Sequence, residues 1–138
     1  MEQYASVTKP RMTATEVNAL TDRIVDACFA VHRNMGPGLS ETIYEECLIK
    51  EFKRRKINYG SQVRIEIKYL GEPLSKHLIL DLLVEDEVIL ELKAVEDFAP
   101  IHEAQLLTYM RLTQKQIGYL INFNVKLMKY GIRRLRIG

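Results

Sequence analysis

The chain has 138 residues, of which 47% are hydrophobic and 28% are charged, and its formal net charge is +2. This length supports one hydrophobic core, and the composition is ordinary for a soluble globular protein. No apolar run approaches the roughly 18 residues that cross a bilayer, and the first twelve residues lack the apolar stretch of a secretory signal. Cys28 and Cys47 show neither zinc-site nor disulfide spacing, so we interpret them as reduced thiols of a cytoplasmic protein with no membrane partner.

The charges are unevenly distributed along the chain. Between residues 85 and 97 six acids accompany one base, whereas five bases and no acid follow residue 125, and a second basic cluster occupies residues 53–56. An acidic centre between basic segments is typical of a cation site that also holds a polyanion. The alternative is two solvated faces and a basic tail without a role in binding.

The first part of the chain has the apolar spacing of two helices. Thr13 and Glu16 form a capping box, and the apolar residues that follow predict a helix over residues 14–34. Gly36-Pro37-Gly38 ends this helix, and a second helix is predicted over residues 41–56.

After Gly60 the apolar period changes from that of a helix to that of a strand. The alternation over residues 63–69 predicts a strand with one face in water, and Gly71-Glu72-Pro73 is predicted to turn the chain. Two nearly continuous apolar runs, 78–84 and 88–95, predict central strands that are buried on both faces.

One more helix and two more strands complete the chain. A helix is predicted over residues 101–114, a buried strand over 117–123 and an alternating edge strand over 132–137. This order of elements indicates an α/β fold. We expect residues 13–138 to form a single domain and residues 1–12 to form a flexible N-terminal arm.

The two central strands hold three charges, Asp81, Glu91 and Lys93, within the most apolar segments of the chain. Buried carboxylates are unfavourable unless a partner or a metal compensates them. If the three residues between the strands form the hairpin loop, Asp81 lies directly opposite Glu91 with Cβ atoms about 4.5–5.5 Å apart. Lys93 then projects from the same face of the sheet.

Two carboxylates at this distance predict a bound divalent cation. They repel by about 4 kcal/mol at a separation of ~4 Å and an effective dielectric of ~20. Oxygen ligands without Cys or His favour Mg²⁺ or Mn²⁺ over zinc. A carboxylate-bound metal beside an ammonium group suits phosphodiester hydrolysis. The alternative is an ion pair between Lys93 and one of the acids, which leaves the second acid unexplained.

These residues resemble a known signature. Asp81, nine intervening residues and Glu91-Leu92-Lys93 are similar to the D…(D/E)-x-K motif of the PD-(D/E)XK nuclease superfamily. Gly38, Glu41 and Tyr44 match G-x-x-E-x-x-Y, the motif of a small family placed in that superfamily, and similar segments extend to Gly131-Ile132-Arg133-Arg134. The resemblance implies a restriction-endonuclease-like α/β fold, in which helices flank a mixed sheet with the Asp81–Glu91 hairpin at its centre.

The resemblance also implies an activity, which is Mg²⁺- or Mn²⁺-dependent hydrolysis of DNA, with RNA as the less favoured nucleic acid partner. Protein partners are unknown. Two residues depart from the pattern. Leu80 stands where the superfamily's name has a proline. Ile79 stands where members of the family often have a basic residue, which removes one expected phosphate contact. The implied catalytic residues are Glu41, Asp81, Glu91, Lys93 and Gln105. The implied metal ligands are Asp81, Glu91, the Leu92 carbonyl and Glu41. The implied substrate-binding residues are Tyr109, Tyr44, His102, Arg133 and Arg134.

Other interpretations of these residues stay open at this point. Glu41 in the first turn of its helix also suits the helix dipole. His102, Gln105 and Tyr109 share a helix face that is ordinary for solvent-exposed residues. The whole domain could also be a nucleic-acid-binding or accessory module that no longer cuts. No sequence-reading element is visible, so cleavage is expected to be structure-selective or weakly selective.

Overall fold

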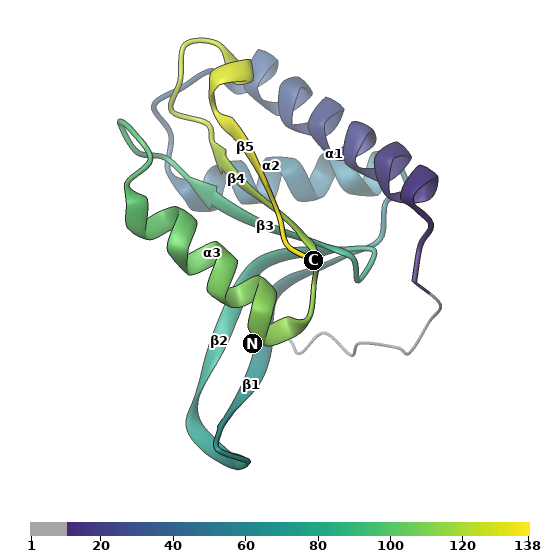
Figure 1. Ribbon diagram of the computed structural model, residues 1–138. Helices are drawn as coiled ribbons and strands as arrows, with labels where there is room; N and C mark the ends of the chain where they lie inside the picture. Colours follow the sequence, from purple (N-terminus) through teal and green to yellow (C-terminus); the bar gives the residue numbers. More distant parts are fainter. Residues whose placement is uncertain (1–10) are drawn as a thin grey trace.

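The computed structural model describes residues 11–138, which form a five-stranded mixed sheet with helices on both faces (Figure 1). The α/β architecture expected from the sequence is therefore confirmed. The elements within these residues are α1 (Ala14–Met35), α2 (Glu41–Arg54), β1 (Tyr59–Tyr69), β2 (Glu72–Val84), β3 (Val88–Lys93), α3 (Pro100–Thr113), β4 (Ile117–Asn122), the short 3₁₀ helix η1 (Met128–Tyr130) and β5 (Ile132–Arg136).

The predicted capping box begins α1. The Thr13 hydroxyl accepts a hydrogen bond from the Glu16 N–H at 3.2 Å, and the Glu16 carboxylate accepts one from the Thr13 N–H at 2.9 Å. Most of the expected N-terminal arm, residues 1–10, lies outside the described residues. Met12 differs from that expectation, because it packs against the core and its N–H donates to the Glu87 carboxylate at 3.2 Å.

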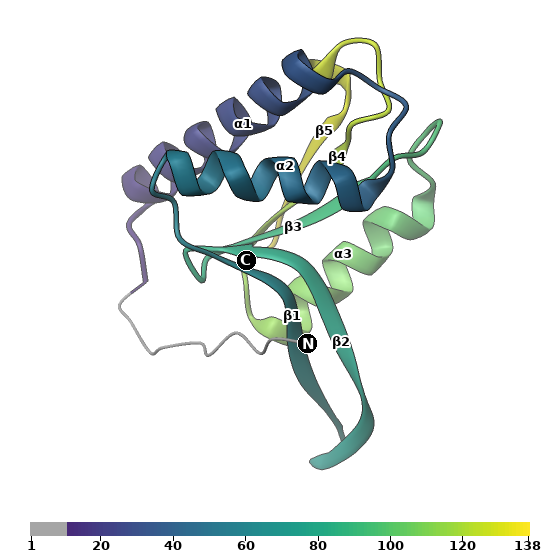
Figure 2. The ribbon, with the colours of Figure 1, turned by 180° about the vertical axis from the view of Figure 1, so that it is seen from behind.

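The strands follow the order β1-β2-β3-β4-β5, and only the β3–β4 pair is parallel. Helices α1 and α2 cover one face of the sheet and α3 covers the other (Figures 1 and 2). Alternate residues of β3 enter the two cores, since Leu90 packs with α1 and α2 whereas Ile89 packs with α3. Among the helices within residues 11–138, none has both the length and the apolar character of a membrane span.

The hairpin between β2 and β3 has the predicted register. Val84 pairs with Val88 and Leu82 pairs with Leu90, so the loop contains the three residues 85–87. Glu85 and Asp86 both have positive φ angles, 51° and 56°, which let so short a loop reverse the chain. The odd loop length sends the side chains of Asp81 and Glu91 toward the same site.

The hairpin between β1 and β2 is longer than the sequence predicts and extends beyond the rest of the sheet as a two-stranded arm (Figures 1 and 2). The predicted turn at Gly71-Glu72-Pro73 is wrong by one residue. The chain turns at Leu70-Gly71, and Tyr69 pairs with Glu72. The φ angles of 51° and 83° at these two residues are those of the tight turn that matches strand twist.

Candidate active site

Strands β2 and β3 diverge at Asp81 and Glu91. Their backbone ladder ends at Leu82 and Leu90, after which β2 follows β1 into the arm and β3 follows β4 (Figure 2). Beyond the end of this ladder, two side-chain carboxylates accept hydrogen bonds from backbone N–H groups. Glu91 accepts a hydrogen bond from the Asp81 N–H at 2.9 Å, and Asp81 accepts one from the Leu92 N–H at 2.8 Å. We refer to Asp81, Glu91 and Leu92 as the fork.

Both fork carboxylates are held in a setting that disfavours their negative charge. Glu91 is only 6% exposed, and burial, together with the charge of Asp81, raises its pKa to about 8. Burial also raises the pKa of Asp81, against the opposing effects of the Leu92 N–H and the Lys93 charge. Additional positive charge next to the fork would therefore be electrostatically favourable.

Lys93 supplies part of that positive charge from the end of β3. It lies two residues after Glu91 on the same face of the strand, is half-buried, and lowers the pKa of both carboxylates. Within residues 11–138, however, no acid lies within ion-pair distance of its ammonium group. The cluster is therefore not the simple Lys93 ion pair that the sequence left as an alternative.

Helix α2 brings two carboxylates to the fork. Glu41 accepts a hydrogen bond from the Ala94 N–H at 3.0 Å, and its charge raises the pKa of Asp81. Glu45, one turn later, was not among the predicted residues. It accepts hydrogen bonds from the Ser61 hydroxyl at 2.9 Å and the Gln62 amide at 2.8 Å. Burial, with a contribution from Asp81, raises the pKa of Glu45. Its i+4 spacing from Glu41 is the sequence signal that could have identified it.

Gln62 is a second residue that the sequence did not reveal. It lies on β1 between the pairs Ser61–Leu82 and Val63–Leu80, and so opposite Asp81. Its side chain hydrogen-bonds to Asp81 as well as to Glu45, which lowers the pKa of both acids. Its φ of 52° is unusual for a residue other than glycine, asparagine or aspartate. Such backbone strain is frequent at functional sites, but a glutamine in an alternating strand carries no signal for it.

Helix α3 places Tyr109 and Gln105 on the other side of the fork. Burial raises the pKa of Tyr109, and the charges of Glu91 and Asp81 raise it further, whereas a side-chain hydrogen bond with Gln105 lowers it. Tyr109 therefore lies within electrostatic reach of the fork. Gln105 is exposed and joins the cluster through Tyr109. His102 has a local role instead, because its Nδ1 accepts a hydrogen bond from the Ala99 N–H at 3.0 Å at the start of the helix.

The two predicted arginines of β5 lie on opposite faces of the sheet. Glu91, Leu120 and Arg133 occupy one row across three strands, so Arg133 is on the face of the fork. Its guanidinium contacts Glu103 at 3.1 Å and lies over the Phe98 ring. Arg134, the next residue, projects from the other face.

Tyr44 is part of the core. Its side chain has no exposed surface and stacks on Phe123 with ring centroids 4.6 Å apart. Its hydroxyl donates a hydrogen bond to the Gly36 carbonyl at 2.5 Å and accepts one from the Leu39 N–H at 3.1 Å. The motif tyrosine therefore fixes the loop before α2 and, through it, the start of the helix that carries Glu41.

The fork has the donor chemistry for a hard cation, because its two acidic side chains offer oxygen atoms and it contains no sulfur or imidazole. Within residues 11–138, no group of three or more His, Cys, Asp or Glu side chains forms a ready-made metal cage. Asp81 and Glu91 are a pair, with Glu41 and Glu45 in the surrounding layer. A cation here would need to complete its coordination with backbone oxygen, water or substrate, as Mg²⁺ commonly does.

A family model for the PD-(D/E)XK nuclease superfamily matches residues 18–135. The chain belongs to this superfamily. The match includes most of α1, all of α2, the fork and nearly all of β5. No curated protein and no solved structure matches the chain. The mixed sheet flanked by helices is the restriction-endonuclease-like fold of the PD-(D/E)XK superfamily, as expected from the sequence, and membership indicates a nuclease domain with a nucleic acid substrate.

Proposed function

We propose that this chain is a divalent-metal-dependent nuclease that hydrolyses phosphodiester bonds in DNA. The fork carries this proposal, because its buried Glu91 and half-buried Asp81 lie beside Lys93 at the positions of the superfamily motif. Gly38, Glu41 and Tyr44 further support a place in the GxxExxY family of that superfamily.

The proposed ligands of Mg²⁺ or Mn²⁺ are the carboxylates of Asp81 and Glu91 and the Leu92 carbonyl, with Glu41 acting through a bound water. The raised pKa values at the fork support this assignment, since a divalent cation would offset the repulsion between the two acids. When bound, such a cation polarises a phosphate and lowers the pKa of a coordinated water.

The side chains around the fork would bind and orient the substrate. Lys93 would hold the attacking water and stabilise negative charge that develops on the phosphate. Tyr109, with Gln105 bonded to it, borders the same space from α3. Arg133 lies two strands from Glu91, about 9.5 Å away at ordinary strand spacing. Its exposed pair with Glu103 is weak enough for a phosphate to replace.

Three residues expected to bind substrate are not part of this proposal. Tyr44 is buried in the core, His102 caps its own helix, and Arg134 lies on the opposite face.

The test is a cleavage assay on single- and double-stranded DNA and RNA, with Mg²⁺ or Mn²⁺ against EDTA. Asp81→Asn, Glu91→Gln and Lys93→Met should each reduce cleavage by a factor of ~100 or more, a loss typical of removing a group that acts in the transition state. Asn and Gln are chosen because each retains an oxygen that can accept the backbone N–H bond at the fork.

Glu66→Gln, purified in parallel, is the matched control. Glu66 is an exposed acid on the β1–β2 arm, paired only with Arg64 among the described residues, so this variant should cleave like the wild type. Equal cleavage by wild type and Glu91→Gln would identify a contaminant. Metal-independent binding without cleavage would instead support the accessory-module interpretation.

A further inference from the structure

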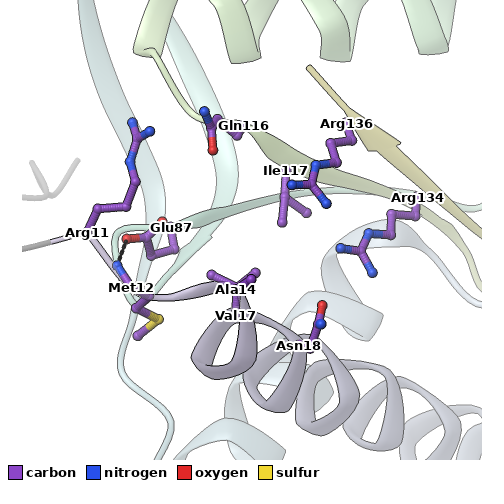
Figure 3. Close-up of a pocket in the computed structure, with 10 residues that line it drawn as sticks. All are labelled: Arg11, Met12, Ala14, Val17, Asn18, Glu87, Gln116, Ile117, Arg134 and Arg136. Atoms are coloured by element: carbon purple, nitrogen blue, oxygen red, sulfur yellow. Dashed lines mark hydrogen bonds between the residues drawn. The ribbon is translucent and has the colours of Figure 1, made fainter. Parts of the chain in front are cut away.

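A separate cavity of about 220 Å³ opens between α1, the β2–β3 loop and β5 (Figure 3). Arg134 and Arg136 reach into it from β5, Ile117 at the start of β4 forms part of its lining, and Arg11 stands beyond Glu87 on the other side. This cavity lies near the first residue of β3 and on the face covered by α1, whereas the fork lies at the far end of β3.

The charge of the cavity is unbalanced. Three arginines and one glutamate line it, which gives a formal charge of +2. One hydrogen-bond acceptor of Glu87 is already occupied, because its carboxylate accepts the hydrogen bond from the Met12 N–H. Within residues 11–138, none of the three arginines has an acid within ion-pair distance. Like charges gathered around one cavity repel, and a bound anion would relieve that repulsion.

The shape of the guanidinium group indicates which kind of anion would bind in the cavity. Arginine presents planar, paired N–H donors that match the oxygens of a phosphate. The first turn of the 22-residue helix α1 also borders the cavity and adds the positive end of the helix dipole. The volume corresponds to roughly seven waters of ~30 Å³ each, so a tetrahedral phosphate fits with space for what is attached to it.

The amount of charge distinguishes a terminal phosphate from an internal one. A phosphomonoester carries about −1.5 to −2 at neutral pH and matches the lining charge of +2, whereas a backbone phosphodiester carries about −1. Arg134 and Arg136 also face away from the fork, so a nucleic acid strand held at the fork would not pass over them. We propose that this cavity is a binding site for a phosphomonoester group, distinct from the fork.

Two sources share this chemistry, namely a small phosphorylated molecule and the 5′-phosphate end of a nucleic acid. The experiment is isothermal titration of the full chain in EDTA, which prevents metal-dependent cleavage. The probes are inorganic phosphate, adenosine 5′-monophosphate, and one oligonucleotide with either a 5′-phosphate or a 5′-hydroxyl. Chloride at equal ionic strength controls for non-specific screening.

Inorganic phosphate should bind, and Arg134→Gln with Arg136→Gln should weaken binding by about tenfold or more, since charge-assisted hydrogen bonds are lost. Arg136→Lys should bind phosphate with an affinity between those of the wild type and the double variant, because it keeps the charge and loses the paired donors. Arg64→Gln is the matched control, because Arg64 is an exposed arginine of the β1–β2 arm, paired with Glu66, and does not line the cavity. A preference for the 5′-phosphate oligonucleotide over the 5′-hydroxyl one assigns the nucleic acid source, and tighter binding of the mononucleotide assigns the small molecule.

Absence of phosphate binding, or equal binding by the wild type and the double variant, would overturn the proposal. Thermal melts of the variants show whether they fold, and little change is expected because both arginines are exposed on an edge strand. The result is independent of the nuclease proposal, since every measurement is made without metal and Glu91→Gln should bind phosphate like the wild type.

Discussion

Glu91 couples the stability of the metal-free protein to pH. Its pKa is about 8 in the folded chain, because of burial and the nearby Asp81 charge, against 4.5 for an ordinary glutamate. The folded state therefore holds a proton that the unfolded chain releases. The stability that this proton contributes is complete below the unfolded pKa and is lost as the pH rises through the folded one.

We predict that the melting temperature in EDTA falls between about pH 5 and pH 9, and that Glu91→Gln removes most of this slope. Thermal melts across this range check the prediction, with Glu66→Gln as a control whose slope should match the wild type. A wild-type melting temperature that rises or stays level over this range would contradict it.

Truncating the Glu91 side chain should destabilise the fold more than neutralising its charge. Glu91→Ala leaves the Asp81 N–H without its acceptor, which costs about 1–3 kcal/mol in a buried position. Glu91→Gln keeps an oxygen there and should be at least as stable as the wild type in EDTA, because an amide is neutral in this buried position without taking up a proton. Chemical unfolding of the two variants measures the difference, and equal stability would show that this hydrogen bond contributes little.

The sequence predicted the central residues of the candidate site for a simple reason. Asp81, Glu91 and Lys93 are charges inside apolar strands, and charges there need an explanation. Gln62 gave no such signal, because a polar residue is expected at alternate positions of a half-exposed strand. Tyr44 gave a misleading one, since a tyrosine in a motif is compatible with substrate contact until its burial is known.

At the scale of the elements, the β4–β5 connection supports the strand end that carries Lys93. Asn122, the last residue of β4, is buried and bonds through its amide to both the N–H and the carbonyl of Val95. Gly131 lies against Asn122, whose N–H donates to the Gly131 carbonyl at 2.7 Å. A Cβ at Gly131 would lie 2.1 Å from the Asn122 carbonyl oxygen.

We predict that Gly131→Ala destabilises the fold by about 2–3 kcal/mol, because a backbone atom must move to admit the methyl group. Gly118→Ala is the matched control within the same sheet. The atoms nearest to its Cβ would be side-chain atoms of Leu106 and Met110, at 2.9 Å, and these can shift more easily than backbone. Denaturant unfolding of both variants tests the contrast, and an equal cost for the two would contradict it.

Register was predictable and strand length was not. The number of residues between two apolar runs decides which residues of a hairpin are opposed, so the register that brings Asp81 and Glu91 together followed from counting. The exposed outer parts of β1 and β2 lack a buried face, and the alternation that marks a strand fades there. The predicted turn, Gly71-Glu72-Pro73, therefore lies slightly beyond the observed one at Leu70-Gly71.

At the scale of the whole molecule, the proposed metal should stabilise the fold as well as support cleavage. A ligand that binds only the folded state adds about 2.7 kcal/mol at a concentration of ~100 times its dissociation constant. We predict that Mg²⁺ or Mn²⁺ raises the melting temperature of the wild type but not that of Asp81→Asn. Lys93→Met should cost about 1 kcal/mol in EDTA, a modest loss because the side chain is half-buried and partly screened.

A purely structural cluster would give a different pattern in the same melts. All three substitutions, Asp81→Asn, Glu91→Gln and Lys93→Met, would then destabilise the protein to a similar extent. The wild type would show no shift with either metal. That combination of results would contradict a metal-binding role for the fork.

The hydrogen bonds of the fork have a consequence for amide exchange. The N–H groups of Asp81 and Leu92 are protected by carboxylates, whereas their neighbours along the strands are protected by backbone carbonyls. Any event that draws those carboxylate oxygens away, such as protonation or cation capture, should change deuterium uptake at these two amides and leave the Leu82–Leu90 ladder unaffected. The two amides would thus act as built-in reporters of the state of the site, readable in the resting protein without substrate.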